Sequence, residues 1–426
     1  MKNKKALTLL FTANAISGFA QGISMLAIPW YFADILNDSA SFGIIYAITT
    51  FATLFWGLYS GTLIDRYPRK NIFLALCIFG FIMLSSVASV GFYLGEVPKL
   101  LIAIVFCSTI FTYNMHYPNL YAFGQEITEK KNYGKTNSMI EIIGQSTSVL
   151  SGAFAALLLT GINTELLSKI GLGFITSFNI KPWELHEIFL LDAFTYVIAF
   201  SLIWFIKYTP TAPKKVDTGN VLQRLKQGVS FLKQHPLVFY FGTSSFAIFI
   251  VLLIHVHQLM PIYVNNHLNS SGGVYAIAEM TYALGALLAG IGIRWAFKHV
   301  NTVKSIIILM IMSIIVFELL VITKSAFILY FVCFIVGITN AGSRILRITY
   351  LFNHIPNYII GRAGSVFQAL NIFSRFALIS IFAFPFFSVG NNIIWAYVIG
   401  GIFITLSAIP LIIYYKKLVN LNIKHE

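Results

Sequence analysis

Twelve apolar stretches, each long enough to cross a lipid bilayer, follow one another along this chain of 426 residues. A helix needs about 20 predominantly apolar residues to cross about 30 Å of hydrocarbon. We therefore predict an all-α membrane protein with twelve transmembrane helices, at 7–35, 41–64, 71–94, 98–123, 136–160, 187–207, 237–264, 273–296, 304–322, 326–350, 363–387 and 394–415.

Charged residues are too scarce for a surface that faces water. They make up 10% of the chain, whereas a soluble domain carries about 25%. The predicted location is the cell membrane, as a multi-pass protein surrounded by lipid. The three cysteines have no metal-ligand spacing, so we expect no metal site. We also expect no cofactor.

The lysines and arginines are distributed unevenly between alternate loops. Of the 29 bases, 21 fall in the loops on one side of the predicted membrane and four in the loops on the other. Because basic residues stay in the cytoplasm, both termini are predicted to be cytoplasmic. The net charge of +14 is thereby explained by topology. No basic face with interleaved aromatic residues is present, so no nucleic-acid partner is expected.

Two connections carry apolar segments of their own. The longer one separates a predicted N-terminal six-helix half, 1–208, from a C-terminal half, 237–426. This linker, 209–236, contains VLQRLKQGVSFLKQ, whose apolar residues share one face and predict an amphipathic helix at the membrane surface. The loop 161–186 contains IGLGFITSF, which we interpret as a membrane-surface cap. A packing insertion is an equally good interpretation.

One loop concentrates charge directly after an apolar stretch: residues 61–71 read GTLIDRYPRKN. Pro68 predicts a turn, and the orientation rule keeps Arg66, Arg69 and Lys70 in the cytoplasm. Asp65 gains nothing from that rule, because acidic residues contribute little to orientation. A solvated loop acid and a working part of a gate are both open interpretations of Asp65.

The same stretch resembles the signature G-x-L-x-D-R-x-G-R-K that major facilitator superfamily members carry between spans two and three. The matching residues are Gly61, Leu63, Asp65, Arg66, Arg69 and Lys70, while Pro68 replaces the usual glycine. The resemblance implies the major facilitator fold over essentially the whole chain. It also implies that Asp65 contacts the cytoplasmic start of span eleven, near 360–365, where a helix N-terminus attracts a carboxylate. Such a contact would be a gate latch between the halves.

The span-six segment FLLDAFTYVIAF resembles, more narrowly, the macrolide-efflux type of drug:proton antiporter within that superfamily. This resemblance implies export of a drug-like compound in exchange for protons. Span four lacks the arginine that many proton antiporters carry there, and span five lacks the Gly-Pro pair common to exporters. The direction of transport is therefore open.

Polar side chains inside the spans are the candidates for a substrate cavity. An ionisable group costs about 2.5–3.5 kcal/mol inside a bilayer, so each needs a compensating role. The family's plan places spans one, four, seven and ten around a central cavity. The candidates are Asn14, Gln21, Asn114, Gln145, His255, Gln258, Asn340, Arg344, Asn371 and Arg375. For any one of them, hydrogen bonding between helices is the alternative.

Two acids inside the spans, Glu141 and Glu279, are the candidates for proton coupling. Burial disfavours an ionised carboxylate, so such a group can load and release a proton. Pairing with an intramembrane arginine is the competing interpretation and would keep the acids ionised; those arginines are Arg344, Arg347 and Arg375. Arg347 is expected close enough to the cytoplasm for its side chain to reach water.

Together these features predict a secondary active transporter that moves a small molecule by alternating access. We favour proton-coupled export of a drug-like or amphipathic metabolite by a monomer. Transport of an anionic metabolite or siderophore is the alternative, because three arginines lie within spans. A membrane enzyme or a receptor is the alternative from another class. An enzyme is disfavoured because the chain has no nucleophile–base set, no metal motif and no P-loop.

Overall fold

The structure, a computed structural model, describes residues 3–161, 181–209, 221–356 and 359–421. Over these residues it contains helices and no strand. Twelve helical segments among them are long and apolar enough to cross a membrane, which confirms the predicted fold class. The apolar segment predicted as a surface cap, 170–178, lies outside the described residues.

The first six spans match the predicted ranges to within about three residues. They are α1 (Lys4–Asp34), α2 (Ser39–Arg66), α3 (Arg69–Leu94), α4 (Lys99–Glu126), α5 (Tyr133–Thr160) and α7 (Leu185–Trp204). Local sequence sets their ends. Pro68 and Pro98 directly precede α3 and α4, because proline has no N–H and suits a helix start. Gly95 ends α3 with a φ of 82°, a conformation that glycine adopts without strain.

The last five spans are α12 (Gly272–Ala296), α13 (Thr302–Ile322), α14 (Ala326–His354), α15 (Ile360–Phe382) and α16 (Ile393–Ile413). The predicted end of span eleven at residue 387 is wrong. The helix stops at Phe382, and a 3₁₀ turn, Pro385–Ser388, follows. Pro385 cannot donate a backbone hydrogen bond and therefore cannot continue the helix.

Span seven is not the single α-helix that its apolar pattern predicts. It consists of α9 (Pro236–Ser245), α10 (Ala247–Ile254) and α11 (Met260–Ile262), with π-helical turns at His255–Leu259 and Tyr263–His267. In the first π-turn the N–H of Met260 bonds to the carbonyl oxygen of His255, five residues earlier. Such turns occur often at functional sites.

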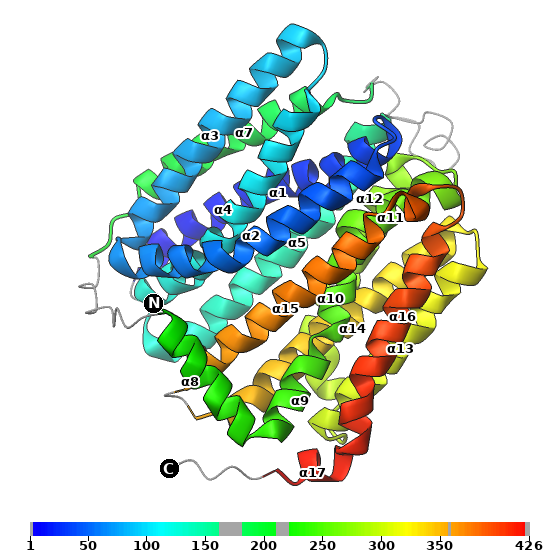
Figure 1. Cartoon of the computed structure of the whole chain (residues 1–426). Coiled ribbons are helices and arrows are strands. Elements are labelled where there is room, and N and C mark those ends of the chain that lie inside the picture. The colour runs from blue at the N-terminus through cyan, green and yellow to red at the C-terminus, as the bar shows by residue number, and fades with distance from the viewer. Residues whose placement is uncertain (1–2, 162–180, 210–220, 357–358, 422–426) are drawn as a thin grey trace. The chain divides into compact units, whose positions relative to one another are not determined.

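The chain forms two compact units, which we call unit 1 and unit 2. Unit 1 contains residues 1–38, 55–216 and 270–280, and unit 2 contains 39–54, 217–269 and 281–426. In unit 1, α7 packs against both α1 and α3. In unit 2, α13 packs against α14 and α16 (Figure 1).

The predicted amphipathic helix is present as α8 (Val221–Gln234), which packs against α15 within unit 2 (Figure 1). Phe231 and Leu232 are 8% and 3% exposed and lie in an apolar cluster with residues of α14 and α15. At Gly228, a side chain would overlap the carbonyl oxygen of Arg362. Much of the apolar face therefore packs on protein, while Val229 is exposed. Its place at the membrane surface stays a prediction.

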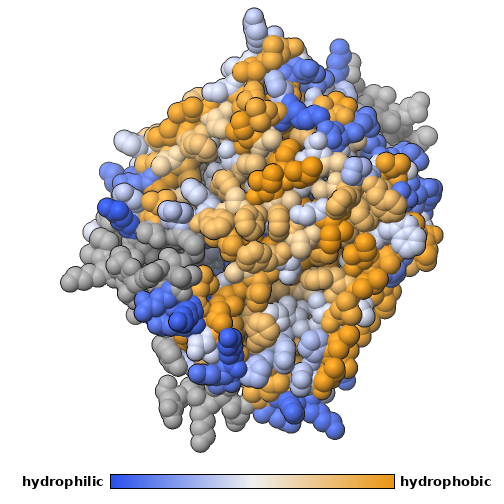
Figure 2. Space-filling model, in the orientation of Figure 1, coloured by the Kyte–Doolittle hydropathy of each residue, from blue (hydrophilic) through white to orange (hydrophobic). Residues whose placement is uncertain are grey.

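Large apolar side chains cover much of the outer surface. Figure 2 shows hydrophobic residues over the flanks of the helices and hydrophilic residues near the helix ends. Trp295, Phe327 and Ile322 are each more than three-quarters exposed. So much exposed apolar area would be unfavourable in water and is expected for a surface in contact with lipid.

Small residues let α12 and α14 approach closely inside unit 2. A Cβ on Gly337 would overlap the carbonyl oxygen of Tyr282, and one on Gly285 would overlap that of Phe334. Ala286, Ala289 and Ala341 continue the contact. Backbones approach this closely only where side chains are small.

We expect Gly337→Val to destabilise the folded protein by about 3 kcal/mol, at the upper end of overpacking costs, because a backbone oxygen cannot move aside easily. The measurement is the thermal unfolding midpoint of the purified protein in detergent. Gly290→Ala on α12 is the control, since nothing lies within 4 Å of its Cβ position. Equal midpoints for Gly337→Val and the control would show that the two helices are not in close contact.

Candidate functional site

The stretch 61–71 joins the end of α2 to the start of α3 in unit 1. Gly61 has open space around its Cβ position. Arg66 is exposed, with its guanidinium 5.7 Å from the centre of the Tyr67 ring. The side chain of Asp65 lies outside the described residues. The predicted latch therefore stays a prediction.

Lys70 and the backbone of Arg69 link the start of α3 to neighbouring helices. Lys70 Nζ donates to the carbonyl oxygens of Trp204 and Ile206, at 2.8 and 2.9 Å, at the end of α7. A positive charge there also stabilises the negative end of the helix dipole. The carbonyl oxygen of Arg69 accepts a bond from Asn119 of α4 at 3.0 Å. Lys70 and Arg69 thus fix the start of α3 relative to α4 and α7.

A surface cleft of about 420 Å³ adjoins Lys70 and is lined by Pro68, Lys70, Asn71, Ile206, Lys207 and Tyr208. Burial raises the pKa of the Tyr208 phenol, and the nearby charge of Glu126 raises it further. The phenol therefore stays neutral, while the two lysines make the cleft positive.

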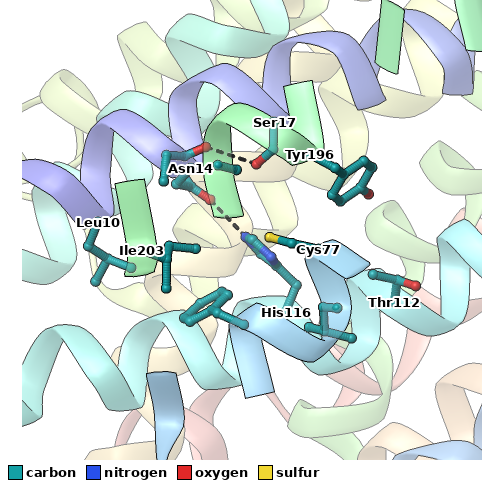
Figure 3. A pocket seen from close by; sticks show the side chains of 12 residues that line it. Leu10, Asn14, Ser17, Cys77, Thr112, His116, Tyr196 and Ile203 are labelled. Atoms are coloured by element: carbon teal, nitrogen blue, oxygen red, sulfur yellow. Dashed lines mark hydrogen bonds between the residues drawn. The ribbon is translucent and has the colours of Figure 1, made fainter. Parts of the chain in front are cut away.

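Polar residues of α1 bond to neighbouring helices of unit 1. Asn14 Oδ1 lies 2.8 Å from Nε2 of His116 on α4 (Figure 3). Gln21 donates to the hydroxyl of Tyr196 on α7 at 3.4 Å. The cavity shown in Figure 3 adjoins Asn14, His116 and Tyr196 and has a volume of about 10 Å³. That volume holds about one water molecule, so Asn14 and Gln21 are placed to link helices here.

The two other cavity candidates of unit 1 lie on α4 and α5. Asn114 donates to the carbonyl oxygen of Ile110 on its own helix at 2.9 Å. Gln145 is half-buried on α5. Neither observation places Asn114 and Gln145 in contact with each other.

Both proton-coupling candidates belong to unit 1. The hydroxyl of Tyr121 donates to Glu141 Oε1 at 2.5 Å. Glu279 is half-buried on α12, and its Oε2 is buried without a hydrogen-bond partner among the described residues. The two helices that carry these acids touch at Gly152 of α5, whose Cβ position is 3.0 Å from the carbonyl oxygen of Ala276.

A second group of polar side chains lies in unit 2, around Arg375. This Arg375 cluster consists of Tyr46, His257, Gln258, Asn371 and Arg375. Arg375 hydrogen-bonds to Tyr46, and the Tyr46 ring meets that of His257 edge-on at 5.8 Å. Gln258 donates to the carbonyl oxygen of Ile379, one turn beyond Arg375.

Several polar atoms of the Arg375 cluster are buried without a partner among the described residues. They are His257 Nδ1, Gln258 Oε1, Arg375 Nε and both side-chain polar atoms of Asn371. A buried polar group without a hydrogen bond costs about 1–3 kcal/mol. A polar ligand or ordered water could satisfy these groups, so the cluster is the best candidate site for a substrate in unit 2.

His255 differs from the residues of the Arg375 cluster. It is 1% exposed, its Nδ1 lies 3.0 Å from the hydroxyl of Tyr397, and its Nε2 lies 3.6 Å from Cys333 Sγ. Both ring nitrogens therefore have neighbours inside the apolar core of unit 2. This placement makes His255 a core histidine.

The polar residues of α14 occupy different environments. Asn340 donates to the hydroxyl of Tyr282 at 3.1 Å, and its Oδ1 has no partner among the described residues. Arg344 is half-buried. The prediction that the Arg347 side chain reaches water is wrong. It is 5% exposed and donates to the carbonyl oxygen of Ser245 at 2.9 Å. Its guanidinium also lies 3.8 Å from the centre of the Phe246 ring, so the break between α9 and α10 provides its partners.

The model of the Major Facilitator Superfamily matches residues 10–379. The chain belongs to this superfamily. The match covers most of both six-span sets and identifies the protein as a multi-pass membrane transporter, not an enzyme. The prediction from residues 61–71 is thus confirmed at the level of the family.

Relatives and solved structures agree with this assignment. The transporter is 21% identical to macrolide efflux protein A of Streptococcus pyogenes over 329 residues, 76% of this chain and 75% of that protein. It is 23% identical to macrolide efflux protein A of Enterococcus faecalis, over 64% of this chain and 78% of that protein. These similarities support the narrower resemblance of span six.

Two solved structures illustrate the shared fold. A bacterial homolog of the human lysosomal transporter Spinster has a TM-score of 0.67 at 13% identity, over 97% of both chains. A D-xylose–proton symporter has a TM-score of 0.69 at 11% identity, over 96% of this chain and 97% of that one. At these identities, the likeness shows the fold alone.

Proposed function

We propose that this transporter exports an amphipathic, drug-like small molecule in exchange for protons. The observation that supports export of such a compound is the similarity to macrolide efflux proteins over three-quarters of the chain. Proton exchange is supported by Glu279, whose buried Oε2 has no partner among the described residues. A carboxyl group in that setting can take up a proton at little cost and can release it when the site opens to water.

The proposal includes two halves, 1–208 and 237–426, that are joined by the linker 209–236 and alternate access to a midplane site. Both termini lie in the cytoplasm, where 21 of the 29 bases are placed by the orientation rule. The transporter works as a monomer in lipid and needs protons and a small-molecule substrate as its partners.

A second candidate substrate class is an anionic metabolite. The Arg375 cluster supports it, because a buried guanidinium with an unpartnered Nε is suited to a carboxylate. Arginine binds carboxylates through two parallel hydrogen bonds. The direction of transport is then export or import.

The deciding experiment measures uptake of labelled compounds into inside-out membrane vesicles, with and without an imposed proton gradient. The compounds are matched cationic, neutral and anionic amphipaths, a macrolide among them. We expect gradient-dependent accumulation of the neutral and cationic compounds. Accumulation of anions alone would favour the second candidate, and uptake that ignores the gradient would refute proton exchange.

We further propose that Asp65 is a latch between the halves. Asp65→Asn is expected to leave insertion unchanged, because orientation rests on the bases. Transport should fall about tenfold, from the loss of about 1–2 kcal/mol of helix-end attraction in one state. Initial transport rates at equal protein levels test this expectation. Glu129→Gln, in a loop on the same predicted side, is the control and should transport normally. Normal rates for Asp65→Asn would exclude the latch.

A further inference from the structure

Unit 1 contains another acid inside a span, Asp192 of α7, which is only 2% exposed. Its Oδ2 accepts a hydrogen bond from the hydroxyl of Ser24 on α1 at 2.8 Å. Its Oδ1 is buried and has no hydrogen-bond partner among the described residues. One oxygen of this carboxyl group thus has a hydrogen-bond partner, and the other has none among the described residues.

No opposite charge lies beside Asp192 on the helices packed against it. These helices are α1 and α3, whose bases, Lys4, Lys5, Arg69 and Lys70, all lie in the first turn. The other titratable residues of the three helices are Tyr31 and Asp34 on α1, Cys77 and Tyr93 on α3, and His186, Glu187 and Tyr196 on α7. An isolated carboxylate in such surroundings is far more costly than the neutral acid.

The contact with Ser24 can persist in both protonation states. A serine hydroxyl carries one donor and two acceptor lone pairs and rotates to suit its partner. Ser24 can donate to the ionised Asp192, as in the structure. When Oδ2 carries a proton, the acid can donate to Ser24 instead. The pair needs no rearrangement of the helices to hold or lose a proton.

Polar groups lead away from Asp192 along the contact between α1 and α7. Tyr196 lies one turn farther along α7 and accepts from Gln21, at 3.4 Å. Tyr196 also borders the water-sized cavity of Figure 3, beside Ser17 and Asn14. Polar side chains and one water-sized cavity therefore lie along the same helix contact as Asp192.

We propose that Asp192 is a proton-binding site of this transporter, separate from Glu141 and Glu279. On protonation a bond forms between the proton and a carboxyl oxygen of Asp192; the proton is taken from water and is released to water again. Proton binding at Asp192 is inferred from the surroundings of this residue alone. Its use in transport rests on the proposed proton exchange.

The direct test is infrared difference spectroscopy of the purified protein in lipid during a change of pH, without substrate. We expect a carboxylic-acid C=O band that disappears in Asp192→Asn, whose amide oxygen still accepts the Ser24 hydrogen bond. Asp34→Asn, a half-buried acid at the end of α1, is the control and should keep the band. A band that is unchanged in Asp192→Asn would overturn the proposal.

A second variant covers the case in which Asp192→Asn does not fold. Ser24→Ala removes a hydrogen bond that is stronger to the ionised than to the neutral acid, so the C=O band should persist and change at a higher pH than in the wild type. An unchanged midpoint would overturn the proposal.

A transport assay separates proton binding at Asp192 from the use of that proton in transport. Asp192→Asn should lose gradient-driven accumulation but keep exchange without a gradient. If the band assignment holds and the wild type ignores the gradient, only the proposed proton exchange fails.

Discussion

Replacing Glu279 by glutamine is expected to abolish accumulation of substrate against a gradient when only a pH difference drives it. Glutamine keeps the size and the polarity of the side chain but cannot carry a proton. Glu141→Gln should have the same effect, because both acids lie in unit 1, on helices that touch at Gly152. Exchange of substrate without a pH difference should continue in both variants.

Reconstituted vesicles provide the measurement, with labelled substrate followed after a pH jump. Glu318→Gln is the matched control, since Glu318 is also half-buried but lies on α13 in unit 2. It should accumulate substrate as the wild type does. If Glu141→Gln and Glu279→Gln both still concentrate substrate, neither residue carries the coupling proton.

Arg375→Lys should raise the KM for anionic compounds about ten- to a hundredfold and leave neutral compounds unaffected. Lysine keeps the charge but loses the planar fork that binds a carboxylate through two bonds. Hydrogen bonds to charged groups contribute about 1.5–3 kcal/mol each, which corresponds to this range. Initial rates over a series of concentrations, for matched anionic and neutral substrates, give the comparison.

Arg344→Lys tests the second arginine among the cavity candidates in the same assay. Arg347→Lys is the control, because Arg347 is held by Ser245 and Phe246 and should affect stability without changing substrate preference. If the arginines pair with the acids instead, the lysine variants of Arg344 and Arg375 should shift the pH optimum for every substrate alike. Wild-type behaviour of both variants toward all compounds would remove the main support for anion transport.

The number and type of the spans could be predicted because the bilayer imposes one simple requirement. Every backbone polar group in lipid must be bonded within its own segment, so a long apolar stretch has to be a helix. Span ends were less predictable. The end of α15 at Phe382 depends on Pro385, whereas the π-turns of span seven have no signal in an apolar pattern.

The contacts of polar residues could not be predicted, because they depend on which helices become neighbours. Asn14 and His255 looked alike in the sequence as polar groups inside spans. The structure pairs Asn14 with His116 in unit 1, and it encloses His255 between Tyr397 and Cys333 in unit 2. Arg375 is placed differently, with an Nε that has no partner among the described residues.

Sequence reasoning overlooked the tyrosines that hold the ionisable groups. Tyr121 bonds to Glu141, and Tyr46 bonds to Arg375. Tyrosine counts as an aromatic residue in an apolar stretch, so its hydroxyl is easily missed. The spacing of Tyr121 on α4 gave no sign of the partner on α5.

The π-turns of span seven change which residues share a side of that helix. An α-helix advances about 100° per residue, so His255 and Tyr263, eight residues apart, would point about 80° away from each other. The extra residue in the first π-turn reduces this angle to about 20°. Both side chains accordingly meet Tyr397, with His255 Nδ1 3.0 Å from its hydroxyl and the Tyr263 ring 5.4 Å from its ring. A helical wheel drawn at 3.6 residues per turn therefore misassigns every residue after Leu259, and an alignment of this span with an uninterrupted helix needs a one-residue gap at each π-turn.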